Sequence, residues 1–461
     1  MRYGLLFLLA GALAASEVVR EADAKALSAM VSFLASDVLE GRDTPSMGLK
    51  VASEYIASEF RAVGLKTSFQ EAKLRVRRVE RKGFAVSLTD GQRSLSLPVE
   101  NAMWTAGPKL DLAGVTVGRA KLDAMPEKVE PVMVLEGPMG PGLRGAVEKL
   151  AGGGAKLILL VGIAMPVPAQ AVEFEDQPQT GYVMLRTTNA EAEAMLKAGV
   201  ELKANVHIEE AGVTVEAARN VIGVLEGSDE KLKSEYVLLT AHYDHLGMRP
   251  NDAGDRVYNG ANDNASGVAS IIESARLLAG LKVAPKRSVM FVAFFGEERG
   301  LLGSRYFVRN PVAPLRQMVA NLNLEQTGRT DSSEGPNVGQ VNLTGYHFTT
   351  IHRHMEAAGE ATGLKVVKHE RFSDAYFMAS DNAALASVGV PSTTLSVTYA
   401  FPDYHQKGDE WEKIDYANMA KVTRGIAQGT YLAAEAAERV NWNAAEDKTK
   451  VYRAAAAKLV Q

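Results

Sequence analysis

The chain has 461 residues, which is long enough for two or three domains with substantial cores. Hydrophobic residues make up 46% and charged residues 23%, as in ordinary globular proteins, and a formal charge of −4 argues against nucleic acid or anionic membranes as partners. There is no cysteine, which excludes disulfides, thiolate metal ligands and a cysteine nucleophile.

The first residues have the pattern of a secretory signal. Arg2 precedes an apolar run from Leu5 to Ala15, and Ala12-Leu13-Ala14 fits the small residues found before a cleavage site. The run is too short to span a bilayer as a mature helix, and no comparable stretch follows. We therefore predict a signal peptide at residues 1–14 and an exported protein, periplasmic or secreted, without a stable membrane anchor after cleavage.

Residues 15–69 contain two predicted helices, at 24–39 and 48–63. In the second, apolar residues recur at helical spacing until Gly64 ends the pattern. We interpret this region as the N-terminal part of the main domain.

The pattern of hydrophobic residues changes in residues 70–216. Short apolar or alternating runs such as Phe84–Leu88 and Val132–Leu135 are separated by glycine and proline turns, which is typical of short strands. The region contains no cluster of catalytic or metal-binding residue types. We predict an inserted, β-rich domain that forms a separate lobe and supplies no ligands.

Residues 217–461 alternate between predicted strands and helices. Tyr236–Thr240 is a predicted strand, Gly267–Leu278 a helix, and Ser288–Phe295 is apolar on both faces, as in central parallel strands. The pattern predicts an α/β fold with a mixed, mostly parallel central sheet flanked by helices. In such sheets functional residues lie at the carboxyl ends of the strands.

Five side chains follow these strands or lie in glycine- and asparagine-rich turns, and their types suit two zinc ions per chain. One carboxylate must bridge two adjacent ions, and Asp263 is the natural bridge because it lies in a tight turn. The predicted ligands are His242, Asp263 and Glu325 for one ion, and Asp263, Glu298 and His405 for the other.

Two further carboxylates have predicted catalytic roles. Asp244 lies two residues after His242, on the same face of a strand, and can accept the second imidazole N–H. Glu297 precedes the ligand Glu298 and can take a proton from a water bound between the ions, then pass it to a leaving amine. This is hydrolytic chemistry.

These motifs resemble the co-catalytic dizinc exopeptidases of metallopeptidase family 28, which include aminopeptidase Y and glutamate carboxypeptidase relatives. The resemblance covers Val221–Ser228, the ligand segments through His405, and the leading segment Phe33–Arg42. It implies the ligand roles given above, a phosphorylase/hydrolase-like α/β fold and a cis peptide bond after Asp263. The insertion resembles, more loosely, the protease-associated domain that many members carry.

Several positions extend or depart from the family pattern. Many aminopeptidases of the family have Asp where this chain has Glu325, and the longer side chain changes the space beside the substrate amine. Tyr404 resembles a tyrosine that supports the tetrahedral oxyanion in some members, and Asp409 is expected to support His405. We interpret His245 as a structural residue of the turn after Asp244.

The prediction is an exported aminopeptidase that cleaves N-terminal peptide bonds by means of a zinc-bridging hydroxide and a glutamate base. Its partner is a peptide substrate and not nucleic acid. A zinc carboxypeptidase or amidohydrolase of the same fold is the alternative. A metal-dead peptide-binding protein is a third reading, which the loss of a ligand would have favoured, but none of the five is lost. The preferred side chain and the oligomeric state are left open.

Overall fold

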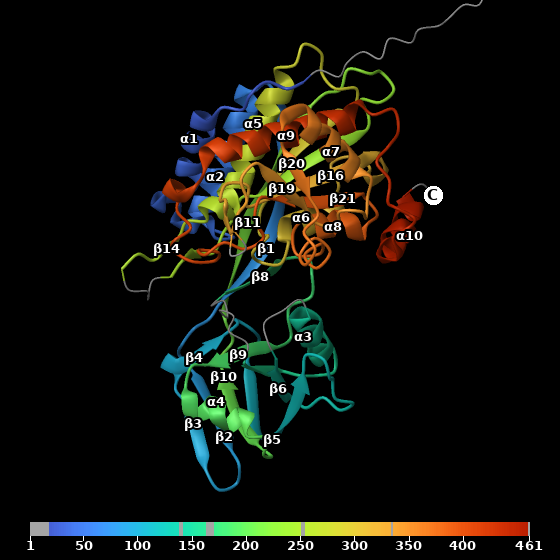
Figure 1. Ribbon diagram of the computed structural model, residues 1–461. Coiled ribbons are helices and arrows are strands. Elements are labelled where there is room, and N and C mark those ends of the chain that lie inside the picture. Colours follow the sequence, from blue (N-terminus) through green and yellow to red (C-terminus); the bar gives the residue numbers. More distant parts are fainter. Residues whose placement is uncertain (1–17, 138–141, 163–169, 250–253, 333–334, 460–461) are drawn as a thin grey trace, which may run out of the picture. The chain divides into compact units, whose positions relative to one another are not determined.

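The computed structural model describes residues 18–137, 142–162, 170–249, 254–332 and 335–459. They divide into two compact units (Figure 1): the first combines the chain up to Glu71 with the chain from Arg219, and the second is Ala72–Ala218. The second unit begins and ends two residues later than the predicted insertion, 70–216. The predicted signal peptide lies outside the described residues. No helix in the described ranges combines the length and apolar character needed to cross a membrane.

The first unit contains most of a nine-stranded mixed sheet, whose last strand, β8, lies in residues 72–218; the sheet and its helices confirm the predicted α/β class. Neighbouring strands β21, β16, β12 and β15 run parallel, while β11 and β19 pair antiparallel with this central group. The strands in spatial order are β20 (Lys365–Val367), β19 (Gln340–Leu343), β21 (Ser392–Ser396), β16 (Met318–Glu325), β12 (Tyr236–His242), β15 (Ser288–Phe294), β11 (Gly212–Leu225), β1 (Lys66–Arg78) and β8 (Gln170–Phe174).

β8 departs from the prediction that the insertion has only strands of its own. It lies within the predicted insertion, yet it pairs antiparallel with β1, from Leu74 opposite Phe174 to Arg78 opposite Gln170, and is the last strand of the nine. The five residues of β8, Gln170–Phe174, carry no local pattern that indicates which strand they pair with.

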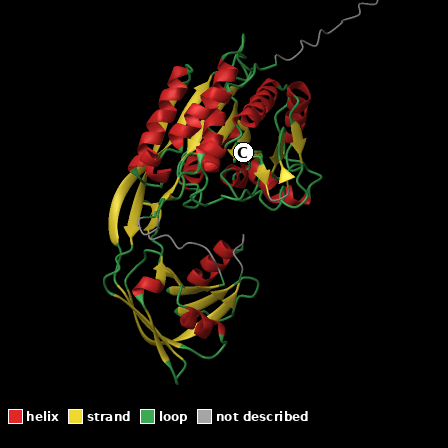
Figure 2. Cartoon of the chain, turned by 60° about the vertical axis from the view of Figure 1, so that its left-hand side comes forward, coloured by secondary structure: helices red, strands yellow, loops and turns green. Residues whose placement is uncertain are grey.

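Alternate residues of the central strands face two helical layers (Figure 2). On β15, Met290 and Phe294 pack in one cluster with Phe307 of α6, whereas Phe291 on the other face lies 6.1 Å from the Phe60 ring of α2, between centroids. This period of two is what a strand buried on both faces produces. The helices are α1 (Ala24–Leu34), α2 (Met47–Ala62), α5 (Ser266–Ala279), α6 (Leu302–Arg309), α7 (Ile351–Thr362), α8 (Asn382–Ser387), α9 (Tyr416–Glu435) and α10 (Lys450–Leu459).

The second unit has its own eight-stranded sheet with a helix on each face. Val132 and Val134 pack with α4, while Met133 and Leu135 pack with α3. The strands in spatial order are β3 (Ser94–Leu97), β2 (Phe84–Thr89), β10 (Lys203–Ile208), β5 (Leu110–Lys121), β6 (Val132–Glu136), β7 (Leu157–Val161), β9 (Val183–Thr187) and β4 (Ala102–Trp104), with helices α3 (Leu143–Gly152) and α4 (Ala190–Lys197). Two short ribbons, β13–β14 (Gly247–Met248, Val257–Tyr258) and β17–β18 (Asp331–Ser332, Gly335–Pro336), complete the strands.

The N-terminal segment turns earlier than predicted. α1 ends at Leu34 rather than continuing to residue 39, because the Ser36 hydroxyl accepts the N–H of Val38 and starts a new turn, Asp37–Arg42. Within this turn Glu40 and Gly41 have φ of 48° and 66°, which no helix accommodates. The turn places Arg42 inside the first unit, where its side chain is buried.

Candidate metal centre

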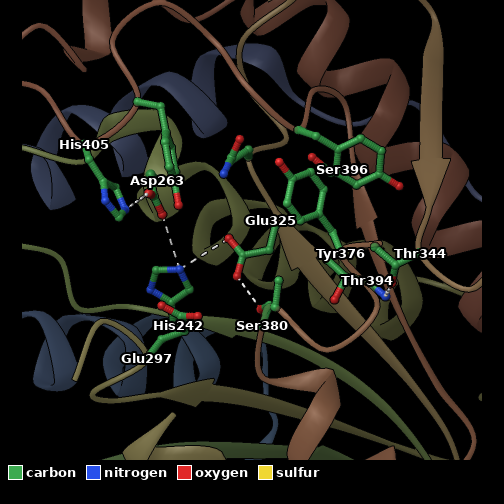
Figure 3. A pocket seen from close by; sticks show the side chains of 14 residues that line it. His242, Asp263, Glu297, Glu325, Thr344, Tyr376, Ser380, Thr394, Ser396 and His405 are labelled. Atoms are coloured by element: carbon green, nitrogen blue, oxygen red, sulfur yellow. Dashed lines mark hydrogen bonds and ion pairs between the residues drawn. The ribbon is translucent and has the colours of Figure 1, made fainter. Parts of the chain in front are cut away.

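The register of the central strands brings two predicted ligands together. β12 ends at His242 and β16 ends at Glu325, and Thr240 lies opposite Asn323, so the two strand ends are level. His242 Nε2 lies 3.3 Å from Glu325 Oε2. Both side chains are buried at the carboxyl edge of the sheet, as the α/β pattern predicts (Figure 3).

Asp263 reaches the same point from the Ala261–Ala265 turn that precedes α5. Its Oδ1 lies 3.4 Å from His242 Nε2, and its peptide bond to Asn264 is cis, as the resemblance implied. The carboxylate of Asp409 accepts the N–H groups of Asn262 and Asp263 at 2.9 and 3.0 Å. Asp409 therefore holds this turn, which corrects the expectation that it supports His405.

A second group of side chains forms around the other oxygen of Asp263. Asp263 Oδ2 lies 3.2 Å from His405 Nε2, and that nitrogen lies 3.3 Å from Oε1 of Glu298. Asp263 thus directs one oxygen toward each group. The structure also brings in His245, whose Nδ1 is 2.9 Å from Glu298 Oε1.

The position of His245 differs from its interpretation as a residue of the turn alone. Ligand atoms of His245, Asp263 and Glu298 lie within 4.8 Å of one another, as do those of His242, Asp263 and Glu325. β12 ends at His242, so strand periodicity does not determine the direction of a side chain three residues later. One sequence feature could have indicated a role for His245, namely that it lies three residues after the predicted ligand His242.

Asp244 connects the end of β12 with the turn after β15. Its carboxylate accepts the N–H of Glu297 at 3.0 Å and the N–H of Glu298 at 3.3 Å. It also lies 3.6 Å from His242 Nδ1, but this ring nitrogen is closer, at 3.2 Å, to the carbonyl oxygen of Asp244. The predicted hydrogen bond from the imidazole to the Asp244 carboxylate is thus replaced by one to its carbonyl oxygen, while the carboxylate lies nearby and fixes the backbone of the two glutamates.

Arg42 is a supporting residue that the sequence did not single out, although it lies in a segment of family resemblance. Its buried guanidinium donates to the carbonyl oxygens of Tyr243 at 2.9 Å, Asn259 at 2.7 Å and Gly260 at 3.0 Å. A further bond goes to the carbonyl of Leu34. Arg42 thereby ties the chain after His242 to the turn that carries Asp263.

Comparison with known protein families identifies this unit. Residues 220–430, which carry all five predicted ligands, match the model of peptidase family M28. This part of the first unit is therefore similar to peptidase family M28. The match begins at residue 220, after the second unit has ended at Ala218, so it assigns no family to Ala72–Ala218.

Curated relatives of this chain carry peptidase names. A probable zinc metalloprotease of Pyrenophora teres f. teres is 37% identical over 116 residues, which are 25% of this chain and 24% of that protein. Aminopeptidase YwaD of Bacillus subtilis is 34% identical over 226 residues, 48% of this chain and 46% of that protein. The chain thus spans between a quarter and about half the length of these curated relatives.

A solved structure shares the fold over nearly the whole length. The aminopeptidase from Aneurinibacillus sp. strain AM-1 superimposes with a TM-score of 0.65 over 92% of this chain and 95% of that chain, at 18% identity. At this identity the likeness establishes the fold and not the activity.

The candidate metal centre opens into a pocket of about 140 Å³. Glu297 and Tyr404 line it, and the Tyr404 ring stacks on His405 with centroids 4.0 Å apart. Ser380 donates to Glu325 Oε1 at 2.6 Å, which leaves Oε2 facing His242 (Figure 3). The pocket is also lined by Thr344, Tyr376, Ala379, Thr394, Ser396 and Tyr399.

In the candidate metal centre, the charges of the carboxylates and the burial of the side chains shift the pKa values of both histidines and of Glu297. Burial lowers the pKa of His405, but Glu298 and Asp263 outweigh burial and raise it to about 11. His242 behaves similarly: burial opposes the shift, yet Glu325 and its other carboxylate neighbours hold its pKa well above the usual range. Burial raises the pKa of Glu297 well above its usual value, and His242 only partly offsets this.

The donor atoms fit divalent cations. Both ring nitrogens of His245 and Oε1 of Glu298 are buried without a hydrogen bond, although such groups are normally paired. Converging carboxylates and imidazoles with unused lone pairs are the ligands that zinc binds in the absence of cysteine. His242, Asp263 and Glu325 form one such group, and Asp263, Glu298 and His405 form the other.

Proposed function

We propose that this chain is a dizinc aminopeptidase. The observation that carries the proposal is Asp263, which presents one oxygen to His242 and the other to His405 beside a pocket lined by Glu297. A carboxylate shared in this way is suited to bridging two ions. The family assignment and the relatives named as zinc metalloprotease and aminopeptidase support the same activity.

His242, Asp263 and Glu325 would hold one zinc ion, and Asp263, Glu298 and His405 the other. When bound, the ions would supply Lewis acidity toward the scissile carbonyl and make a water acidic at neutral pH.

Glu297 is the group that moves protons. Its carboxylate would accept a proton from the attacking water and deliver it to the leaving nitrogen, so that one residue serves as base and then as acid. The raised pKa of Glu297 in its buried position favours this exchange. Its backbone is held by Asp244, which limits how far the carboxylate can move from the pocket.

The polar end of the pocket would receive the free ammonium of the substrate. Glu297 and Glu325 line the pocket beside the proposed bridging Asp263, and Ser380 restrains Glu325 by donating a hydrogen bond to Oε1. Tyr376 and Tyr399, which also line the pocket, would contact the first side chain of the peptide. Tyr404 lines the same space and would support the oxyanion that forms at the scissile carbonyl.

Two further parts of the proposal concern the rest of the chain. The sequence pattern of residues 1–14 supports export to the periplasm or the medium. The second unit, Ala72–Ala218, would act as a protease-associated-like domain that influences access of peptides without supplying ligands.

The deciding experiment compares aminoacyl anilides with their N-acetylated forms, using purified protein loaded with zinc. Acetylation removes the ammonium charge and adds bulk, so cleavage should fall at least about tenfold, or about 1.4 kcal/mol in transition-state stabilisation. Equal or faster cleavage of the acetylated substrates would instead identify a carboxypeptidase or amidohydrolase. A protein that binds peptides but hydrolyses neither series, with or without zinc, would be a binding protein.

A further inference from the structure

His245 is the one imidazole in the centre that the five-ligand set leaves without a role. Its side chain is fully buried and lies between the Asp263 turn and the turn that carries Glu298. Nδ1 is 2.9 Å from Glu298 Oε1 and 4.0 Å from Asp263 Oδ2. The His245 ring also meets the ring of His405 edge to face, with centroids 5.7 Å apart.

The contact between His245 and Glu298 is short but is not aligned as a hydrogen bond. Neither ring nitrogen of His245 nor Oε1 of Glu298 has a hydrogen-bond partner, and these atoms are shielded from solvent. A buried polar group without a partner destabilises the folded state, and two such groups facing each other are uncommon in a folded protein. Lone pairs that converge without a proton between them are the arrangement expected of two ligands of one ion.

The surrounding backbone fixes the ring in this orientation. Gly260, at φ 59°, leaves space that a Cβ would fill, because such an atom would lie 2.5 Å from Cγ and 2.6 Å from Cδ2 of His245. Gly260 is itself held through its carbonyl oxygen by Arg42. The carbon edge of the imidazole therefore lies against Gly260, and Nδ1 is directed at the carboxylates of Asp263 and Glu298.

We infer that His245 is a further metal ligand, binding through Nδ1 to the ion held by Asp263, Glu298 and His405. This inference rests on the metal assignment in the proposed function. Neighbouring ligand atoms around a tetrahedral zinc ion are separated by about 3.3 Å. The ligand atoms are separated by 2.9 Å (His245 to Glu298), 3.2 Å (His405 to Asp263), 3.3 Å (His405 to Glu298) and 4.0 Å (His245 to Asp263), which suits a shared ion.

The two metal positions would then differ in kind. The position of His242 and Glu325 has three protein ligands with Asp263 and keeps an open place for water or substrate, as catalytic zinc sites do. The other position gains a second imidazole and a fourth protein ligand, which is closer to a closed site. Two imidazoles also favour zinc, cobalt or nickel over magnesium, calcium and manganese.

The competing role for His245 is to donate a hydrogen bond to Glu298 and orient it without touching metal. His245→Gln separates the two, because glutamine retains an N–H donor but is a poor zinc ligand. In the dicobalt protein, each coordinated histidine contributes one strongly shifted, exchangeable imidazole N–H signal to the proton NMR spectrum. The wild-type protein should show three such signals, from His242, His245 and His405.

His245→Gln should show two signals, and the affinity of the second position should fall at least tenfold in a competition titration. His405→Gln serves as the matched ligand variant with the same loss, and His207→Gln, in the second unit, should keep all three signals. Two signals in the wild-type protein would overturn the inference even if every variant failed to fold, and so would wild-type affinity in His245→Gln.

The outcome is separate from that of the proposed function. Three shifted signals in a protein that cleaves no anilide would reject the aminopeptidase activity and keep His245 as a ligand. Hydrolysis of anilides by a protein with two shifted signals would support the aminopeptidase activity and reject His245 as a ligand. A protein that binds no cobalt at all would reject the inference.

Discussion

The two halves of the metal centre are assembled by different means. In the half around His242 and Glu325, each side chain stands at the end of a parallel strand, and sheet register alone makes them meet. In the half around Glu298 and His405, the side chains come from irregular turns that buried polar groups must hold. Asp244 anchors the Glu298 turn through backbone N–H groups, and Asp409 does the same for the turn of Asp263.

The half assembled by strands therefore depends on sheet register, and the half assembled by turns depends on side chains outside the proposed ligand set. Regular hydrogen bonding of a sheet positions residues without further help. An irregular turn leaves backbone donors and acceptors unpaired, so each needs a partner from elsewhere in the chain. The turn-built half should therefore respond to substitutions outside the ligand set, and the strand-built half mainly to substitutions within it.

The largest effect is expected where the halves meet. Asp263→Ala removes the carboxylate that faces both groups, so the protein should lose at least one metal ion. Metal Lewis acidity contributes several kcal/mol, and each 1.4 kcal/mol is about tenfold, so the rate should fall by about 10³-fold or more. Metal analysis and anilide hydrolysis test this. Two retained ions would show that the halves bind independently.

Glu297→Gln should leave both halves intact and still remove most of the activity. Glu297 lines the pocket beside His242, and loss of a general base lowers the rate by about 10²–10⁴-fold. Zinc content and melting temperature should stay at wild-type values. The matched control is Glu230→Gln, whose side chain is 85% exposed and should have no effect. Loss of zinc from Glu297→Gln would make this residue a ligand and require a new base.

Ser380→Ala is expected to affect only the strand-built half. It frees Oε1 of Glu325, which allows the carboxylate to rotate away from His242. Loss of a residue that orients a metal ligand typically weakens binding by about 10–100-fold. Stepwise zinc titration should show the first position weakened and the second unchanged. Ser387→Ala is the control, since that hydroxyl bonds to the carbonyl of Ala383 within α8.

The smallest effect is a proton release that accompanies metal uptake in the turn-built half. The pKa of His405 is raised to about 11 without metal, so the ring is protonated at neutral pH and must lose this proton to bind zinc. Affinity there should rise with pH, by up to about tenfold per unit, until pH approaches 11. Calorimetry in two buffers of different ionisation enthalpy measures the released proton, and His405→Gln should abolish this contribution. No release near pH 7 would show that the free ring is already neutral.

The strand-built half is also the part that sequence patterns predict well. Ser288–Phe294 is apolar on both faces, which identifies a central strand, and the alternation of strands and helices then gives the α/β class. Parallel strands end at one edge, so His242 and Glu325 are expected to meet there. The turn after a strand has no comparable periodicity. His245 could not be placed for this reason, although it lies only three residues beyond β12.

Supporting residues were harder still to predict. Arginine is mostly exposed in proteins, so composition and periodicity give no reason to bury Arg42. Asp409 was expected to support its neighbour in sequence, His405, but its carboxylate pairs with a turn about 150 residues away. The pairing of β8 with β1 likewise depends on which segments meet in the folded chain. Such partners follow from tertiary structure and not from local preference.

Arg42 gives the centre a dependence on chain topology. It joins carbonyls of residues 34, 243, 259 and 260, and its bond to Gly260 spans 218 positions, with the whole second unit between them. Contacts so distant in sequence form slowly, because a long intervening segment must first be closed into a loop. We therefore expect the protein to acquire stable metal binding only late in folding, after the N-terminal segment has docked. Resistance of bound zinc to a chelator during refolding would then measure completion of the native topology rather than collapse of the central sheet.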